Sequence, residues 1–564
     1  VSRHRHPPML DLVLCWHFHQ PDYRDESGFV LPWTYLHALK DYSDMAAHLE
    51  AQPAMRCVVN FVPSLLEQLD DYAQQFERGV FRDPLPAALA EPRPSRWSRA
   101  QRLMLVQTCF RLHPPTMLEP FPAYKRLHAL WQQVRDQGAA AVDYLSTQYF
   151  VDLVTWYHLA WTGESLRRSE PLVLALMQKG SGFTLEERRA LLELAGRVVR
   201  GLIPRYRALA ERGQIELSAT PHSHPLAPLL IDFSSAREVR PELVLPRSPA
   251  YPGGAVRLAA HIEAALRCHR EHFGAAPTGL WPAEGAVSEA AVAVFAQAPV
   301  RWIASGEGVL RASLKASGLD VSRPCQWLCR PWRVGQSALA CFFRDDYLSD
   351  LIGFEYKNWF ARDAVRHFLH SIEDRYHYAN APAPVVSVIL DGENAWDHYP
   401  YNGWYFLSEL YAALVEHPAI RLTTFSEYLE RHPDSVLPLP KLVAGSWVYG
   451  DLTTWIGQPD KNRAWDLLCA AKQAYDTAVG GLDEAGAAAA EALLRSCESS
   501  DWFWWFGDAN PAESVRAFDR LFRGKLKRLY ALLGLAAPAE LDTAVSAGGG
   551  PAELGGVMRR GVEG

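Results

Sequence analysis

The chain has 564 residues, of which 49% are hydrophobic, and a formal net charge of −7. No block of like charge stands out, which argues against nucleic acid or an anionic membrane as the main partner. No run of about 18 apolar residues occurs, so no membrane span is expected. The length exceeds that of one ordinary domain but suits a large barrel with additions. The 19 Trp and 22 Tyr offer flat apolar faces that can meet sugar rings, although many of them should fill the core.

The nine cysteines are scattered along the chain, and only Cys325 and Cys329 lie close together. No second close pair or histidine cluster accompanies them at zinc spacing, so we expect buried free thiols and a reducing compartment. The N-terminus has a basic start and a short apolar run without a small-residue cleavage site, which predicts a first strand and not a signal peptide. Together these features predict a cytoplasmic location.

Seven apolar runs predict the strands of one sheet. They are LDLVLCWHFHQP (10–21), MRCVVNFVPSL (55–65), QIELSATPHSHPL (214–226), TGLWPAEG (278–285), VRWIASGEG (300–308), ALACFFRDDYLSD (338–350) and VVSVILDGENAWDHY (385–399). Nearly continuous apolar sequence is typical of strands that are buried on both faces. Helical patterns separate the runs, and the alternation of strand and helix predicts an α/β fold with a parallel sheet.

Polar side chains stand at the ends of these runs. In parallel barrels the catalytic side chains lie at the carboxyl ends of the strands. Six candidates occupy such positions: His17, His19, His224, Glu284, Asp345 and Asp391. Their recurrence predicts a barrel mouth lined with polar groups.

The regions outside the strands are largely helical by pattern. Residues 95–210 predict a helical insertion between the second and third strands. From about residue 405 the helical patterns follow one another without strands. We therefore expect a catalytic barrel over residues 1–404, a C-terminal helical region over 405–535, and a tail over 536–564 whose Ala, Gly and Glu content predicts disorder.

Two carboxylates that face each other across a cleft are the minimum for cleaving a glycosidic bond. Glu284 is the first candidate, with a paired structural role as the alternative. The FRDDYLSD segment offers Asp345, Asp346 and Asp350 beside Arg344. Like charges raise a carboxyl pKa, as a proton donor needs, whereas the arginine lowers it. Asp345 follows the strand directly and is the preferred second carboxylate, while Asp350 could cap the next turn and Asp346 could be solvated.

The histidines of the first run allow two interpretations. His17 and His19 alternate on one strand face and could bind a metal, with Asp391 or His224 as a third ligand. Imidazoles also hydrogen-bond sugar hydroxyls without a metal, and each could be a strand-end residue with neither role. Direct attack by Glu284 needs no metal-activated water and no polarised carbonyl, so we expect no metal and no cofactor.

Five segments resemble, in order, the characteristic regions of glycoside hydrolase family 57. They are HFHQP (17–21), GQIELSATPHSHPLAPLL (213–230), GLWPAEGAVSEAA (279–291), FRDDYLSDLIGF (343–354) and GSWVYGDLTTWIGQPDKNRAW (445–465). The segment 391–411 is similar to the family as well, and the resemblance covers about residues 10–535. The form LSDLIGF looks closer to the α-amylase and amylopullulanase branch than to branching enzymes or glucanotransferases.

The resemblance implies an incomplete seven-stranded β/α barrel with a helical C-terminal region, acting on α-glucans with retention. On the family pattern Glu284 resembles the nucleophile and Asp345 the acid/base, with Asp346 as the alternative. Gly306 stands where an acid is expected, and Asp397 where Glu is usual. The residues that resemble substrate-binding positions, or could bind sugar hydroxyls in the case of Asp391, are His17, His19, His224, Trp281, Asp391, Asp451 and Trp455.

Three functions therefore stand side by side. The first is a retaining hydrolase of α-1,4-glucans such as starch, glycogen or maltooligosaccharides, with α-1,6 links as a further option. The second is a 4-α-glucanotransferase or branching enzyme on the same scaffold, and the third is a non-catalytic glycan-binding barrel. The presence of both Glu284 and Asp345 argues against the third. Hydrolysis and transfer differ in whether water or a sugar hydroxyl resolves the glycosyl-enzyme.

Overall fold

The computed structural model describes residues 9–377, 379 and 381–550. Seven parallel strands form its central barrel in chain order: β1 (Leu10–Phe18), β4 (Cys57–Phe61), β5 (Ile215–Ala219), β6 (Gly279–Leu280), β7 (Trp302–Gly306), β9 (Ala340–Arg344) and β10 (Val385–Asp391). Each of the seven predicted runs contains one of these strands. The strand pairing between β9 and β10 has one register pair, Arg344 with Ser387, so the sheet closes only loosely there. The predicted (β/α)7 barrel is confirmed.

Alternate residues of these strands form two separate cores. Val13, Trp302 and Phe342 come from strands around the barrel and share one small buried cluster with α20 (Phe425–Arg431). Their neighbours along the strands, such as Leu12 and Phe343, belong to the large core that packs against the surrounding helices. Successive side chains of a strand point to opposite faces of the sheet. The position of a polar residue relative to these alternating residues therefore decides whether its side chain points into the barrel mouth or outward.

Helices surround the barrel, and one of them lies at its amino-terminal end. There the hydroxyl of Ser426 in α20 donates to Glu216 at the start of β5, with an oxygen–oxygen distance of 2.7 Å. The polar ends of the strands therefore meet at the other end of the barrel. The surrounding helices are α1 (Trp33–His37), α2 (Ser43–Ala51), α3 (Pro63–Arg78), α12 (Ala227–Ile231), α13 (Gly254–Phe273), α14 (Glu289–Phe295), α15 (Glu307–Ala316), α16 (Pro324–Trp327), α17 (Asp346–Asp350), α18 (Ala361–Tyr376) and α19 (Trp404–Glu416).

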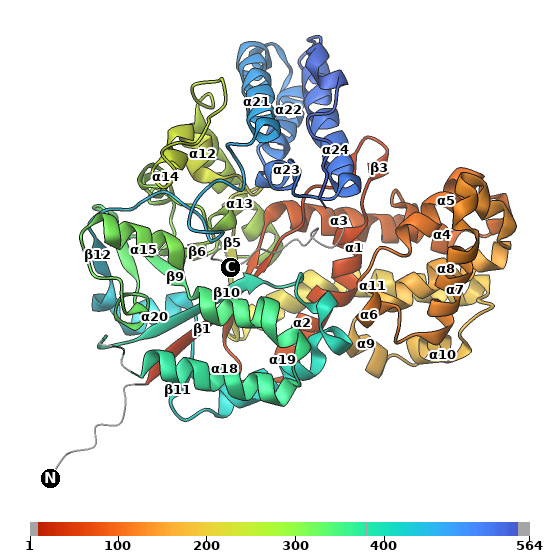
Figure 1. Ribbon diagram of the computed structural model, residues 1–564, viewed down its shortest axis with the longest axis horizontal. Helices are drawn as coiled ribbons and strands as arrows, with labels where there is room; N and C mark the ends of the chain where they lie inside the picture. The colour runs from red at the N-terminus through yellow and green to blue at the C-terminus, as the bar shows by residue number, and fades with distance from the viewer. Residues whose placement is uncertain (1–8, 378, 380, 551–564) are drawn as a thin grey trace.

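Two helical regions extend from the barrel (Figure 1). The insertion between β4 and β5 continues after α3 with α4 (Pro84–Ala90), α5 (Arg99–Thr108), α6 (Pro114–Met117), α7 (Pro122–Val134), α8 (Thr147–Ala160), α9 (Glu164–Ser169), α10 (Pro171–Lys179) and α11 (Leu185–Glu211). The C-terminal bundle comprises α21 (Pro459–Ala478), α22 (Glu484–Cys497), α23 (Ser500–Trp505) and α24 (Ala512–Leu532). No helix in the described part of the chain is long and apolar enough to cross a membrane.

The boundaries of the regions differ from those expected. Beyond residue 404 the chain returns to the sheet, because β11 (Ile420–Leu422) pairs with β1 and β12 (Leu437–Leu439) pairs with β8 (Trp332–Val334). The C-terminal bundle therefore begins only at α21. A two-stranded sheet of β2 (Arg24–Asp25) and β3 (Gly28–Phe29) completes the described strands.

The predicted tail divides at residue 550. Up to that point the chain packs on the C-terminal bundle, since Leu541 and Val545 are buried and the carboxylate of Asp519 accepts from the backbone N–H of Val545 at 2.6 Å. These apolar anchors account for order where composition predicts disorder. The remainder of the tail, 551–564, lies outside the described residues. All nine cysteines lie inside them and are free thiols, eight of them buried.

Candidate active site

Glu284 lies just beyond β6 in a strained backbone conformation. Its φ is +60°, a left-handed value that is costly for a residue with a Cβ, and its side chain is buried. The backbone N–H of Trp447 donates to the Glu284 carbonyl at 2.9 Å, and the indole Nε1 of the same residue donates to Oε2 at 3.0 Å. Trp447 thus holds both the main chain and the carboxyl group of Glu284, and strain held in this way is typical of functional sites.

The surroundings of Glu284 favour its protonated form. Burial raises the pKa of Glu284 to about 8, and the nearby carboxylates of Asp501 and Asp391 act in the same direction. The hydrogen bonds from Trp447 and Ser500 lower the pKa without offsetting the burial. A carboxyl group with such a pKa carries its proton at neutral pH and must lose it before it can act as a nucleophile.

Three predicted histidines gather beside Glu284. His17 Nε2 lies 3.2 Å from His224 Nε2, and the rings of His19 and His224 stack with 3.9 Å between centroids. His224 also has a left-handed φ of +59°. Its Nδ1 lies 3.8 Å from Glu284 Oε1. The sequence-based prediction that these side chains meet at the barrel mouth matches this geometry.

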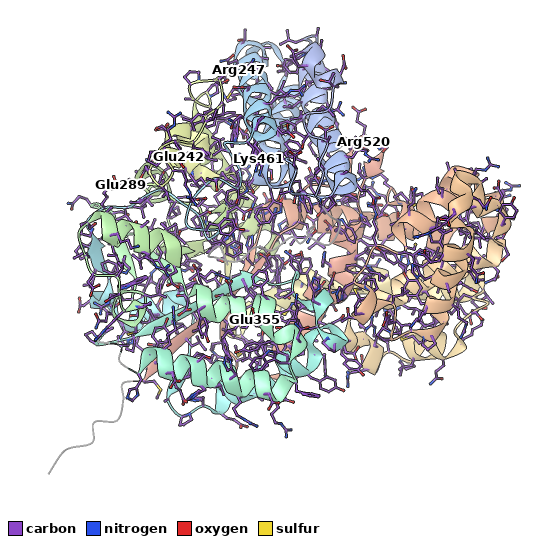
Figure 2. The ribbon with its side chains drawn as sticks, viewed as in Figure 1. Glu242, Arg247, Glu289, Glu355, Lys461 and Arg520 are labelled. Carbon is purple, nitrogen blue, oxygen red and sulfur yellow. The ribbon has the colours of Figure 1, made fainter. Side chains whose placement is uncertain are left out.

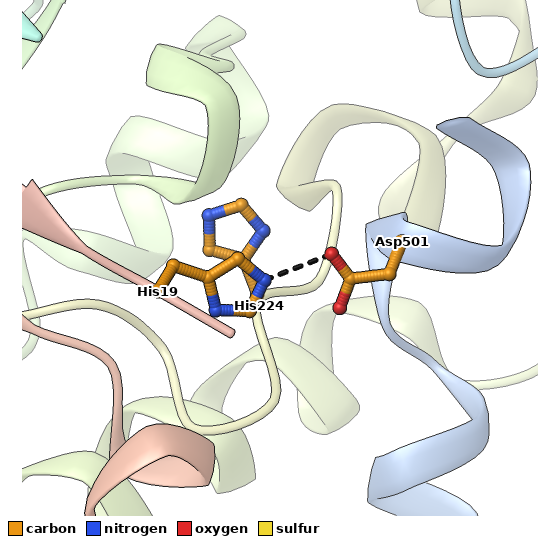
Figure 3. A group of neighbouring side chains, drawn as sticks. All are labelled: His19, His224 and Asp501. Carbon is orange, nitrogen blue, oxygen red and sulfur yellow. Dashed lines mark hydrogen bonds and ion pairs between the residues drawn. The ribbon is translucent and has the colours of Figure 1, made fainter. Parts of the chain in front are cut away.

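Figure 3 shows His19 and His224 with Asp501, which reaches the histidines from α23. One potential ligand atom from each of the three lies within 4.8 Å of the others, a spacing that could hold a metal ion. These atoms already have protein partners, however. His19 Nε2 bonds Asp501 Oδ1 at 2.8 Å, and His224 Nε2 bonds His17. The two Nε2 atoms therefore have partners without a cation, whereas the buried His19 Nδ1 has none among the described residues, and the expectation of no metal stays a prediction.

Asp345, the predicted acid/base, points away from the barrel mouth. Phe343, two residues earlier, points outward into the large core, and Asp345 points the same way. Its carboxylate caps α17 by accepting from the backbone N–H of Leu348 at 2.9 Å. On the outer side it accepts from Arg375 Nε at 2.6 Å and from the Tyr376 hydroxyl. Both partners belong to α18, outside the barrel. A completely buried carboxylate with three donors is a structural anchor, so this geometry does not favour the catalytic role predicted for Asp345.

Asp346 is held differently. Its Oδ1 accepts from Arg344 Nη1 at 2.7 Å, and its buried Oδ2 has no partner among the described residues. Burial raises the pKa of Asp346 to about 7; the Arg344 charge opposes this effect and the Glu307 carboxylate adds to it. The Arg344 guanidinium lies 5.7 Å from the centre of the Trp447 ring, whose N–H bonds Glu284. Asp346 and Glu284 thus flank one arginine–tryptophan pair.

Of the other predicted substrate-binding residues, two lie at this end of the barrel and two do not. Trp281 is buried with its ring centre 6.0 Å from that of His17, and Asp391, paired with His17 across the sheet, has its pKa raised to about 6 mainly by burial. Asp451 instead caps its own turn at Thr453 and bonds Arg240 at 2.9 Å. Trp455 is fully buried against Trp504. Neither has a described contact with the Glu284 cluster.

The segment that carries Asp451 supplies Trp447 in their place. Two hydrogen bonds anchor this part of the chain, and Figure 2 labels both side chains. The carboxylate of Glu289 accepts from the backbone N–H of Leu442 at 3.1 Å, and Lys461 donates to the carbonyl of Thr454. A Cβ on Gly306 would lie 2.6 Å from the Trp447 Cα, so only glycine allows this approach. The departure at Gly306 noted in the sequence thus has a local steric reason.

Three contributors to the site were not predicted from the sequence: Trp447, Ser500 and Asp501. Ser500 Oγ lies 2.7 Å from His224 Nδ1 and 3.3 Å from Glu284 Oε1. The stretch ESSDWFWW places polar residues directly before an aromatic cluster, which is the one signal that could have drawn attention to it. A polar cavity of about 390 Å³ lies beside the cluster, lined in part by Ser223, Ser499 and Asp501.

Comparison with known proteins supports the fold and identifies the family. The model of "Glycosyl hydrolase family 57" matches residues 13–440. A GH57 branching enzyme from Thermococcus kodakaraensis aligns with a TM-score of 0.57 and 14% identity over 93% of this chain and 90% of its own. The α-amylase AmyC from Thermotoga maritima aligns with the same score and identity over 93% of both chains.

A 4-α-glucanotransferase from Thermococcus litoralis aligns with a TM-score of 0.52 and 14% identity over 93% of this chain and 60% of its own. No curated protein matches the sequence significantly. The structural similarities are too remote in sequence to show more than the fold. Because the family model covers more than half of the chain, however, the protein belongs to glycosyl hydrolase family 57.

Proposed function

We propose that this protein is a retaining enzyme that hydrolyses α-1,4-glucans, with Glu284 as nucleophile and Asp346 as acid/base. The observation that carries the proposal is the contrast within the RDD tripeptide and its link to Glu284. Asp346 has a free buried oxygen and a pKa of about 7, and the Arg344–Trp447 pair connects it to the carboxyl group of Glu284. Family members of known structure include an enzyme named as an α-amylase.

In the first step Glu284 Oε attacks the anomeric carbon while the proton of Asp346 passes to the leaving glycosidic oxygen. A pKa near neutrality suits this donor, because the group is protonated before the step and releases its proton readily. In the second step the Asp346 carboxylate takes a proton from water, the resulting hydroxide oxygen attacks the anomeric carbon, and Glu284 leaves as a carboxylate. Two inversions at one carbon retain the α configuration.

The other groups at the site would position the sugar. Trp447 fixes Glu284 and offers an aromatic surface beside it. The histidine cluster and the carboxylates of Asp391 and Asp501 suit hydroxyl recognition, since imidazole nitrogens can donate or accept hydrogen bonds and carboxylate oxygens accept them.

Transfer to a second glucan is the other candidate, and one observation favours it. The side chain of Glu284 is 8% exposed and lies under Trp447 and α23, so few waters can reach a glycosyl-enzyme there. Restricted water favours a sugar hydroxyl as acceptor. Solved relatives named as a branching enzyme and a glucanotransferase show that the fold hosts both outcomes.

Product analysis separates these possibilities. Purified protein would be incubated with amylose, maltoheptaose and pullulan, with chain lengths followed by chromatography and the first-formed anomer by proton NMR. Hydrolysis predicts only shorter reducing chains and an initial α-anomer. Longer or branched products would establish transfer, and an initial β-anomer would exclude the double displacement. The absence of any product, with retained glucan binding, would support a glycan-binding barrel instead.

A further inference from the structure

Glu284 must be a carboxylate when it attacks, yet its surroundings favour the protonated form, so the proton needs a nearby acceptor. Ser500, from the C-terminal bundle, bridges Glu284 to His224. Its main-chain N–H also donates to the His224 carbonyl at 2.9 Å. The main chain and the side chain of Ser500 therefore both contact His224, and the hydroxyl lies between the His224 ring and the carboxyl group of Glu284.

The contacts run from Asn60 through the histidines and Ser500 to Glu284, and the hydrogen atoms along them can be assigned by starting at Asn60. Asn60 Nδ2 donates to Ser218 at 3.0 Å, and Asn60 Oδ1 accepts from Thr220. His17 Nδ1 lies 2.7 Å from the same oxygen, which can only accept. His17 therefore carries its hydrogen on Nδ1. Burial lowers the pKa of His17 to about 3, so the ring is neutral and its Nε2 presents a lone pair.

This lone pair determines where His224 carries its hydrogen. His224 Nε2 lies 3.2 Å from His17 Nε2 and must supply the hydrogen between them. The pKa of His224 is lowered well below its usual value by burial and by the other histidines, so in the resting ring Nδ1 is an acceptor. The Ser500 hydroxyl donates to Glu284 when that group is ionised; when Glu284 is protonated, the hydroxyl donates to His224 Nδ1 instead and its oxygen accepts from the Glu284 carboxyl group. A protonated Glu284 completes the sequence without a repulsive contact.

We propose that the Ser500 hydroxyl relays the proton of Glu284 to His224 during glycosylation and so couples the C-terminal bundle to the chemistry. This inference rests on the proposed role of Glu284 as nucleophile. The O–H bond of Glu284 breaks as a new O–H bond forms at Ser500 Oγ, and the original Ser500 hydrogen moves to His224 Nδ1. The products of the relay are a carboxylate and an imidazolium, and the serine hydroxyl is regenerated.

The charge change has a physical driver. Positive charge develops on the sugar as the glycosidic bond breaks, which stabilises the Glu284 carboxylate at that moment. The imidazolium at His224 is balanced by the carboxylate that Asp346 becomes after protonating the leaving group. The other titratable groups around the pair are His17 from β1, His19 just after β1, Asp391 from β10 and Asp501 from α23.

The test compares Ser500→Ala and Ser500→Thr in the full chain. The activity kcat/KM would be measured from about pH 5 to about pH 9 on an aryl α-maltooligoside whose phenolate leaves without protonation, so that Asp346 does not limit the rate. Ser500→Ala should lose roughly tenfold to hundredfold in kcat/KM and shift the acidic limb of the profile to higher pH. Ser500→Thr keeps the hydroxyl and should restore the wild-type limb.

Ser169→Ala serves as the matched control, because it removes an exposed serine hydroxyl from α9 that donates to the carbonyl of Ser165 and not to Glu284. A Ser500→Ala variant whose rate falls while its acidic limb stays in place would overturn the relay and leave Ser500 a structural role. If that variant does not fold, Ser500→Cys supplies the same comparison with a weak donor of similar size, and an unchanged acidic limb there would also overturn the relay.

Failure of the relay and failure of the proposed function give different results. Mass spectrometry of a trapped glycosyl-enzyme reports whether Glu284 carries the sugar. A label on Glu284 together with an unchanged pH profile in Ser500→Ala contradicts only the relay. A label on another residue contradicts the assignment of the nucleophile and the relay with it.

Discussion

Two buried carboxylate clusters lie on opposite sides of the end of β9, and they differ in how far their oxygens are paired with protein donors. On the outer side Asp345 is matched by Arg375, the Tyr376 hydroxyl and a backbone N–H. On the inner side Asp346 keeps one oxygen unpartnered, and Glu284 has no basic side chain within hydrogen-bonding distance among the described contacts. Adjacent residues thus have opposite surroundings, because Asp345 faces the outer helices and Asp346 lies beside Arg344 on the inner side.

The contrast teaches that burial alone does not mark a catalytic carboxylate. Glu307, on the outer side, is as buried as the inner groups, yet it accepts from Arg311 and from the Asp346 backbone and ion-pairs with Arg375. Its charge is used to hold α15, β9 and α18 together. Glu284 has no such ion pairs, and Asp346 has only Arg344 on one of its oxygens. Burial raises the pKa of both groups, as it does that of Glu307.

The largest effect should come from Glu284→Gln. Loss of the nucleophile removes the covalent route, so kcat on maltooligosaccharides should fall roughly 10⁴- to 10⁶-fold. Thermal unfolding and glucan binding should show a folded protein that still binds. Glu263→Gln, on the exposed side of α13, is the matched control. Near wild-type turnover in folded Glu284→Gln would remove the inner cluster from the chemistry.

The next effect compares neighbours directly. Asp346→Asn should lower kcat about 10²- to 10⁴-fold, because the general acid is lost. Substrates with good leaving groups should partly rescue glycosylation in this variant. Asp345→Asn and Asp391→Asn, assayed in parallel, should lose less activity per folded molecule and show no such rescue. A deeper, rescued loss in either of them would move the acid/base role to that residue.

The effects of the same two substitutions on stability should have the reverse order, with Asp345→Asn costing more than Asp346→Asn. Asp345→Asn leaves Arg375 without its closest carboxylate oxygen and should cost about 3 kcal/mol in the free energy of unfolding. Asp346→Asn should cost clearly less, since one of its oxygens bonds nothing. Urea unfolding of the two variants at neutral pH measures the difference. Equal losses would mean that both carboxylates are structural.

The pH dependence of stability sharpens the same point. Folding raises the Glu284 pKa from about 4.5 to about 8, so below about pH 4.5 the group is protonated in both states and contributes nothing. As the pH rises toward 8 the unfolded state ionises first, and the folded state loses stability relative to it. Glu284→Gln removes this penalty and should stabilise the protein by roughly 1–4 kcal/mol near pH 8. A melting-temperature difference that does not grow with pH would contradict the raised pKa.

The smallest expected effect is that of chelation. His19 bonds Asp501 and His224 bonds His17, so these side chains have protein partners without a metal and activity should survive a strong chelator. Metal content would be measured by mass spectrometry together with turnover before and after treatment. Stoichiometric zinc whose removal abolishes turnover, and whose return restores it, would replace the two-carboxylate scheme with a metal-dependent one.

Much of the fold could be predicted because each barrel strand is a short apolar run that ends in a polar residue. The same property hid the orientation of β9. All five of its residues are buried, so apolar and polar residues do not alternate along it. The sequence therefore cannot show whether Asp345 or Asp346 faces the barrel mouth. The capping of α17 by Asp345, and its contacts with Arg375 and Tyr376, settle its direction only in three dimensions.

The contributions of Trp447 and Ser500 could not be predicted for a different reason. Both reach Glu284 across long chain separations, and the position of each depends on backbone hydrogen bonds to residues with left-handed φ angles, Glu284 and His224. Local sequence patterns do not reveal such pairings. The resemblance of segment 445–465 predicts Trp455 as a substrate-binding residue and does not single out Trp447, which the turn after Gly445 brings to Glu284.

The most direct test of the central claim is to trap the glycosyl-enzyme and sequence the labelled peptide. A 5-fluoro-glycosyl fluoride slows both steps and carries a leaving group that needs no protonation, so the intermediate should accumulate, and more so in Asp346→Asn, which lacks the base for its breakdown. The account predicts one sugar per chain, bound as an ester on Glu284. A label on Asp346, Asp391 or another carboxylate, or no label together with an initial β-anomer, would contradict it.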